Sequence, residues 1–238
     1  MLTVAVLTNL ARSEFLLETL RSLARAGLPT VHLHSDTAQR GHAHAYLEVL
    51  ASVAPPVTDP AGWILLCEDD IAVPVGLGRY LDAVCERLAL HRGRLGFATL
   101  YCSVGYRDWV AAHPVRGAPA FGRLIPNDGY AGTQCILFPA PSLARLLATM
   151  RHCHREHPDF AGDRLLGHAA ERERLEAWCH LPSLVDHRGR LESTVGSRAD
   201  NLAMLAANYV GDAWRGVGSW KIGAGDALTR PTRRASAS

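Results

Sequence analysis

The amino-acid sequence predicts a single α/β domain, Rossmann-like, in which helices flank a central and mostly parallel sheet. Short apolar runs alternate with amphipathic segments from the N-terminus to about residue 101, an order typical of strand–helix–strand units. Hydrophobic residues make up 48% of the 238 positions, so one sizeable core can form. No linker separates two parts. We therefore expect one domain over residues 1–229 and a disordered tail at 230–238.

The first strand–helix–strand unit is the clearest. Leu2–Leu7 is a short apolar run, as expected for a buried strand. Ser13 is a suitable N-cap for a helix that Gly27 ends, because glycine favours the position after a helix. Residues 30–34 alternate in polarity and end just before Asp36, which predicts the second strand.

The later elements follow the same periodicity, apart from one segment. Residues 103–131 are rich in glycine, proline and aromatic residues and show little periodicity, so we expect an irregular functional loop there. The remaining predicted elements are helices over 41–53, 78–91, 141–154 and 163–172 and strands over 63–67, 95–101, 133–138 and 177–181.

Composition excludes some classes of protein. A net charge of +2 with 20% charged residues argues against a dedicated nucleic-acid binder, although a nucleic acid could still be the molecule modified. The six cysteines form no CxxC pair, which favours reduced, buried thiols. With no signal peptide and no apolar run near the ~20 residues of a membrane span, we expect a soluble, cytoplasmic protein.

The most informative motif is Glu68-Asp69-Asp70, which directly follows the apolar run 63–67. Three adjacent carboxylates repel one another, and a divalent cation such as Mg²⁺ or Mn²⁺ removes that repulsion while binding substrate phosphates. Ligands of open α/β sheets bind at the carboxyl ends of the strands, where this triplet lies. The structural alternative is an exposed acidic turn before a helix.

Placed after an N-terminal strand–helix–strand unit, this motif resembles the DXD signature of GT-A glycosyltransferases in its EDD form. The resemblance extends over about residues 3–195 and implies a GT-A-like fold. It implies that Asp70 binds the metal and that Glu68 faces the donor ribose or the water shell of the metal, with Asp69 beside them at the donor.

The same resemblance implies further donor-binding positions. Thr8, Asn9 and Arg12 follow the first strand, where the superfamily binds the nucleotide, and Asp36 follows the second, where such enzymes often contact the nucleobase. Arg40 precedes the helix that leads to the acidic strand.

The segment 182–189 resembles the one that carries a late metal-ligand histidine, which makes His187 a candidate ligand; the alternative is a surface histidine in a turn. Lys221 is a candidate contact to the leaving diphosphate, or an ordinary exposed lysine. The cluster His152, Cys153, His154 and His157 lacks a recognised zinc spacing and fits a polar helix end better.

Two residues are candidates for the catalytic base. Asp163 begins a predicted helix, where inverting members of the superfamily often carry the base, although aspartate there is also a common N-cap. Asp128 is the other candidate, within an Asn-Asp-Gly sequence that is first of all a turn signal.

Together these features predict a metal-dependent, hexosyltransferase-like glycosyltransferase. The donor is a nucleoside-diphosphate sugar, UDP-sugar by analogy, and the cofactor is Mn²⁺ or Mg²⁺. The acceptor stays open: a glycan, natural product, protein or modified nucleic acid. A metal-dependent nucleotidyltransferase ranks second, because residues 8–12 lack the glycine-rich loop that a triphosphate needs. A non-catalytic nucleotide-sugar-binding module is the third alternative.

Overall fold

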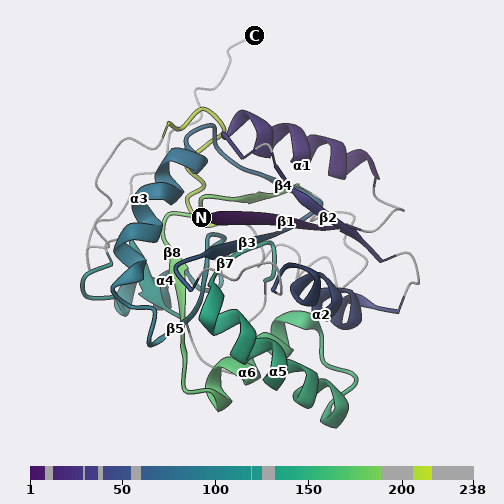
Figure 1. Cartoon of the computed structure of the whole chain (residues 1–238). Coiled ribbons are helices and arrows are strands. Elements are labelled where there is room, and N and C mark those ends of the chain that lie inside the picture. Colours follow the sequence, from purple (N-terminus) through teal and green to yellow (C-terminus); the bar gives the residue numbers. More distant parts are fainter. Residues whose placement is uncertain are drawn as a thin grey trace.

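A seven-stranded sheet forms the centre of the computed structural model (Figure 1). The described residues are 1–8, 13–28, 30–36, 40–54, 60–118, 120–124, 132–188 and 206–215. In spatial order the strands are β2 (His32–Ser35), β1 (Leu2–Thr8), β3 (Trp63–Glu68), β7 (Cys135–Pro139), β5 (Leu95–Thr99), β8 (Glu176–His180) and β6 (Phe121–Arg123).

The sheet is mostly parallel, as the sequence predicts. β2, β1 and β3 run in one direction, and so do β5 and β8. β7 lies between β3 and β5 and runs antiparallel to both, and β6 runs antiparallel to β8 at the far edge. Five of these seven strands therefore share one direction, and β1 and β3 end side by side, with Leu7 opposite Glu68.

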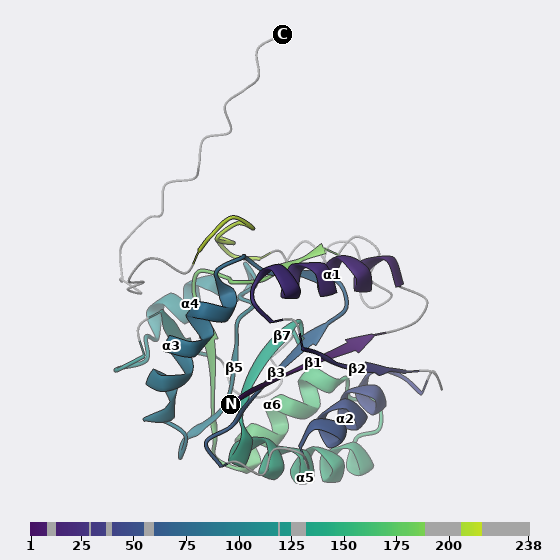
Figure 2. The same cartoon turned by 45° about the horizontal axis from the view of Figure 1, so that its top comes forward.

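Helices cover both faces of the sheet (Figure 2). α1 (Ser13–Arg25) and α3 (Leu77–Ala89) lie on one face, and α2 (His42–Val53), α5 (Ala140–Glu156) and α6 (Gly162–Arg172) lie on the other. Successive residues of a strand point to opposite faces, so a strand between two helical layers must be apolar throughout. In β3, Ile64 and Leu66 pack toward α2 and α5, whereas Leu65 and Cys67 pack toward α1 and α3.

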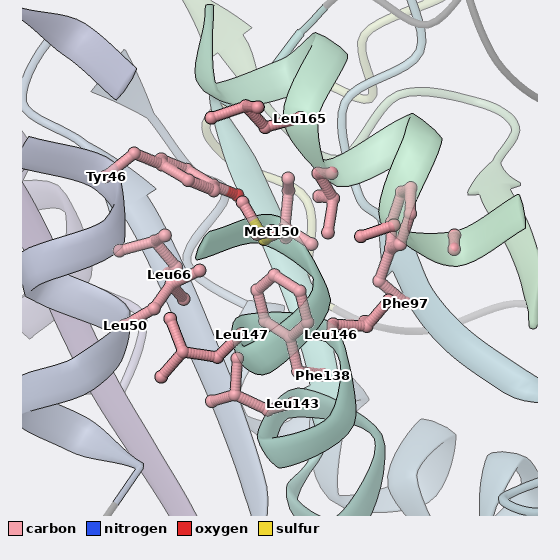
Figure 3. Packing of buried hydrophobic residues seen from close by; sticks show 14 of the residues in the cluster. Tyr46, Leu50, Leu66, Phe97, Phe138, Leu143, Leu146, Leu147, Met150 and Leu165 are labelled. Carbon is pink, nitrogen blue, oxygen red and sulfur yellow. The ribbon is translucent and has the colours of Figure 1, made fainter. Parts of the chain in front are cut away.

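The larger core lies under α2, α5 and α6. Figure 3 shows Tyr46 of α2, Met150 of α5 and Leu165 of α6 converging over Leu66 and Phe138 of the sheet. Removing a side chain from such a core typically costs about 2–5 kcal/mol. These contacts pack α2 and α6 against the sheet, and both helices begin beside the acidic motif.

The predicted elements are confirmed with small shifts at their ends, but the prediction for residues 103–131 is partly wrong. That segment contains α4 (Arg107–Ala112) and strand β6. β6 has only three residues, and its pairing with β8 joins Phe121 to His180. Local periodicity does not reveal so short a strand paired with so distant a partner.

Two further expectations concern covalent chemistry and membranes. All six cysteines are free, and five are buried, as expected of reduced core thiols. Among the helices of the described part, none has the length and apolar character needed to cross a bilayer. The predicted tail at 230–238 lies outside the described residues.

Candidate metal and donor site

The acidic motif lies at the carboxyl end of β3. Glu68 is the last residue of that strand, and its backbone N–H donates to the carbonyl of Gln134 at 2.9 Å. Asp69 and Asp70 form the turn that follows, and both are buried. The alternative interpretation of the motif, an exposed acidic turn, is therefore wrong for Asp69 and Asp70.

Hydroxyl groups of α1 hold this turn in place. The Thr19 hydroxyl donates to the carbonyls of Asp69 (2.7 Å) and Ile71 (2.8 Å), and its oxygen accepts the Ile71 N–H at 3.0 Å. Three residues further along α1, Ser22 makes the same pair of contacts with the carbonyl and N–H of Val73. Because these hydroxyls are buried and bound to backbone, they fix the backbone that presents the carboxylates.

A second, two-stranded sheet brings His187 to the motif. β4 (Ile71–Ala72) pairs antiparallel with β9 (Asp186–His187), and Ile71 lies opposite His187. The Arg188 N–H also donates to the Asp70 carbonyl at 2.7 Å. His187 is therefore held beside the motif by backbone hydrogen bonds, and its interpretation as a surface histidine in a turn is wrong, because it is 8% exposed.

Three potential ligand atoms converge at this point. His187 Nε2 lies 3.0 Å from Asp70 Oδ2, and one atom from each of Glu68, Asp70 and His187 lies within 4.8 Å of the others. The Asp70 side chain is 0% exposed and that of His187 is 9% exposed. Buried carboxylates need compensating positive charge. Two carboxylates and one imidazole form a donor set that suits Mn²⁺ and, through its oxygens, Mg²⁺.

Asp69 is not part of this triad and has a different partner. Its Oδ2 accepts a hydrogen bond from the Thr8 hydroxyl at 2.7 Å, and Thr8 ends the neighbouring strand β1. The middle carboxylate of the motif is thus bound to the end of β1. Thr8 and Asp69 both remain candidates for donor binding.

Glu68 contacts a second group of residues. The Thr133 hydroxyl donates to Glu68 Oε1, and His42 Nε2 lies 3.5 Å from the same oxygen. Partial burial opposes a charge on His42, but the hydrogen bond to Glu68 and the negative charges of Glu68 and Asp163 together raise the pKa of His42 above its ordinary value. His42 is therefore part of the site, although the sequence analysis did not single it out.

Asp163 lies in the first turn of α6, at the same side of the sheet as the carboxyl end of β3. Its Oδ2 accepts the Gly132 N–H at 3.2 Å, and its Oδ1 accepts the Arg164 N–H at 2.8 Å. The N-cap of α6 is Ala161, so the alternative role of Asp163 as an N-cap is wrong. The carboxylate is half-buried and held by backbone donors on both oxygens.

The end of β2 contributes a polar cluster. The Asp36 N–H donates to the Thr8 carbonyl at 3.1 Å, and Asp36 Oδ1 accepts the Arg40 N–H at 3.3 Å. The Arg40 guanidinium in turn pairs with Glu48, which also lies 3.2 Å from His44. Asp36 thus lies beside Thr8, and Arg40 lies beside Asp36. Glu48 was not a predicted residue of the site.

Some candidates cannot be placed. Asn9, Arg12, Asp128 and Lys221 lie outside the described residues. The possible zinc cluster lies within the described residues. Among those residues, however, Glu68, Asp70 and His187 are the one group of His, Cys, Asp or Glu side chains close enough together to hold a metal ion. Instead, His152 pairs with Glu156 one helical turn away, and Cys153 is buried in the core.

Comparison with known proteins assigns no family. No protein-family model matches the chain, and no curated protein matches it. A glycosyltransferase involved in the glycosylation of the major capsid of PBCV-1 aligns with a TM-score of 0.47 and 10% identity, covering 84% of this chain and 96% of that one. Mouse xyloside xylosyltransferase 1 in its apo form aligns with a TM-score of 0.43 and 9% identity, covering 87% of this chain and 95% of that one. Because these TM-scores and identities are low, they carry no functional argument, and the function must be inferred from the residues of this chain.

Proposed function

We propose that this protein is a metal-dependent glycosyltransferase of the GT-A type, which transfers a sugar from a nucleoside-diphosphate sugar to an acceptor hydroxyl. The observation that carries the proposal is the convergence of Glu68, Asp70 and His187 at the carboxyl end of β3. Open α/β sheets bind ligands at that edge. Two carboxylates and an imidazole, with Asp70 and His187 buried and Glu68 partly buried, are suited to a cation that a diphosphate shares.

The residues divide into three roles. Asp70 and His187 would hold Mn²⁺ or Mg²⁺, with Glu68 beside them toward the ribose or a metal-bound water. A bound divalent cation supplies Lewis-acid stabilisation of the charge that develops on the leaving diphosphate. Thr8 and Asp36 lie at the ends of β1 and β2, where they would orient a nucleotide, and UDP is our proposed nucleotide.

Asp163 is our candidate for the base that accepts the proton of the acceptor hydroxyl in an inverting reaction. Two backbone N–H groups fix the orientation of its carboxylate, one bound to each oxygen. A carboxylate oriented in this way can accept a proton through its remaining lone pairs.

Calorimetry with UDP and UDP-sugars, with and without Mn²⁺, tests the donor site, and mass detection of a transferred sugar on a panel of acceptors tests the reaction. We expect binding that strengthens with Mn²⁺ and a mass increase of one sugar. Absence of any nucleoside-diphosphate binding with any metal would remove the proposal. Binding without transfer to any acceptor or to water supports a binding module, and release of pyrophosphate from a nucleoside triphosphate and a sugar phosphate supports a nucleotidyltransferase.

A further inference from the structure

The first residue of α2, His42, touches two parts of the candidate site that no backbone pairing joins. One is Glu68 at the end of β3, and the other is the first turn of α6, which carries Asp163. We propose that His42 is a positioning residue that couples the metal-binding motif to the candidate base. The inference rests on the proposed glycosyltransferase function and deepens it.

The two ring nitrogens of His42 have different partners. Nδ1 accepts the backbone N–H of Gly162 at 3.3 Å. Nε2 lies 3.5 Å from Glu68 Oε1 and 3.5 Å from the Thr133 hydroxyl. An accepting Nδ1 carries no proton, so the proton of a neutral imidazole must be on Nε2, where it faces the Glu68 carboxylate. The contacts therefore define one tautomer.

Close packing makes the contact with Gly162 possible. A Cβ at this glycine would lie 2.9 Å from Cγ of Tyr46 and 3.1 Å from Cε1 of His42, closer than side chains normally approach. Tyr46, one turn after His42 on α2, is fully buried, and its hydroxyl end lies toward Met150 of α5 in the core (Figure 3). Without a side chain at 162, the backbone N–H of α6 reaches the imidazole directly.

The contacts close a ring around the site. Thr133 donates to Glu68, and its neighbour Gly132 donates to Asp163. His42 completes the ring by joining Glu68 to the residue before Asp163. If His42 is removed, Glu68 and the start of α6 keep their links to residues 132 and 133 but lose the direct link to each other.

Two substitutions separate the two contacts. In His42→Asn the amide oxygen takes the place of Nδ1 and can accept the Gly162 N–H, but the side chain is too short to reach Glu68. In His42→Gln the amide nitrogen takes the place of Nε2 and can donate to Glu68, but nothing accepts from Gly162. Each variant is therefore a rescue of the contact that the other one loses.

Steady-state kinetics with UDP-sugar and Mn²⁺ should then divide the two effects. We expect His42→Asn to raise KM for the donor by about tenfold with kcat nearly unchanged, because Glu68 loses a charge-assisted hydrogen bond. We expect His42→Gln to keep KM and to lower kcat by about tenfold, because Asp163 is less well oriented. His152→Asn and His152→Gln, on the surface of α5, are the matched controls and should match the wild type.

Equal losses in the two His42 variants, or wild-type values in both, would overturn the inference. A measurement on the wild-type protein covers the case in which the variants do not fold. With ¹⁵N- and ¹³C-labelled histidine, NMR in the neutral range of the ring should report the Nε2–H tautomer for His42; the Nδ1–H tautomer would overturn the inference alone. A wild-type protein that binds no UDP-sugar would instead overturn the proposed function, and with it the catalytic part of the inference.

Discussion

His187 Nε2 lies 3.0 Å from Asp70 Oδ2, although 117 positions of the sequence separate the two residues. The pairing of β4 with β9 brings them together, and both side chains are almost completely buried. Such a contact has two physical interpretations. It is either a buried ion pair with a charged imidazolium, or two ligands that point at one cation site together with Glu68.

Replacing Asp70 with asparagine separates these interpretations. If Asp70 is a metal ligand, Asp70→Asn keeps the shape but removes one charge at the cation, and turnover should fall on the order of a thousandfold, about 4 kcal/mol of barrier. Folding should survive, because Glu68 loses a nearby like charge. Turnover and melting temperature must be measured on the same preparations.

Companion variants make that comparison specific. His187→Ala should be nearly as severe as Asp70→Asn. Asp69→Asn should be milder, because its amide oxygen can still accept the Thr8 hydroxyl. Asp82→Asn, on the exposed surface of α3, is the charge-matched control. An Asp70→Asn protein that keeps full turnover and the same Mn²⁺ dependence would contradict the metal role.

Metal binding should also raise the melting temperature of the protein, an effect that can be measured without any turnover. A cation that binds only the folded state at one hundred times its Kd stabilises that state by about 2.7 kcal/mol. For a chain of this size the melting temperature should rise by roughly 5–10 °C. Scanning fluorimetry with Mn²⁺, and again after excess chelator, measures this rise. It should disappear in Asp70→Asn and persist in Asp82→Asn; an equal rise in both would place the bound metal elsewhere.

The sequence predicted the parts of the site that local chemistry reveals. A run of carboxylates after a fully apolar strand is a local signal, and it correctly located Glu68 and Asp70 at the edge of the sheet. His187 came from the resemblance of its surrounding segment, because nothing in its immediate neighbours distinguishes a ligand from a surface histidine.

The supporting contacts were not predictable in the same way, since they depend on how distant elements pack. Thr8 and Asp69 are 61 positions apart, and Thr19 bonds to backbone about 50 positions away. One signal was present: Thr19 and Ser22 are hydroxyl residues on the apolar side of a predicted helix, where a buried polar group needs a partner. His42 gave no such signal, because its role requires α6 to begin beside it.

A third group of differences comes from sheet topology. The periodicity of residues 133–138 predicts a strand but not its direction, and β7 proves antiparallel to both neighbours. Likewise, three residues of β6 are too few for a pattern, so its existence depends on pairing with β8. The order of the strands after the first strand–helix–strand unit depends on how the core packs, which local sequence patterns do not show.

The position of β6 gives a stability prediction. A Cβ at Gly122 would lie 2.1 Å from the carbonyl oxygen of Val110 in α4, so the strand and the helix approach too closely for any side chain. Gly122→Ala must push them apart, and overpacking of this kind costs about 1–3 kcal/mol. We expect a melting temperature lower by several degrees.

Gly93→Ala is the matched control, because a Cβ there meets no atom within 4 Å and the residue is exposed. Its melting temperature should stay within about one degree of the wild type. If Gly122→Ala were as stable as Gly93→Ala, the close approach of β6 to α4 would be wrong.

The last prediction concerns the buried histidine of β8. His180 Nδ1–H donates to the Pro182 carbonyl at 2.6 Å, and its Nε2 accepts the Tyr80 hydroxyl at 2.6 Å. The neutral ring is thus satisfied on both sides. Burial lowers the pKa of His180 from 6.5 to about 4, and the hydrogen bond to Pro182 opposes this only in part.

The sign of the resulting pH dependence follows from linkage. The unfolded chain binds a proton at His180 near pH 6.5 and the folded chain only near pH 4, so its contribution to stability is complete above pH 6.5 and is lost as the pH falls through that interval. The loss amounts to about 3 kcal/mol.

Urea unfolding of the wild type and of His180→Gln, from about pH 7.5 to about pH 4, isolates the contribution of His180 because the other histidines are common to both. His180→Gln should be less stable at the upper end, where it lacks one hydrogen bond, and the difference should shrink or reverse toward the lower end. A difference between His180→Gln and the wild type that stays constant over this pH range would show that the His180 ring is not held neutral.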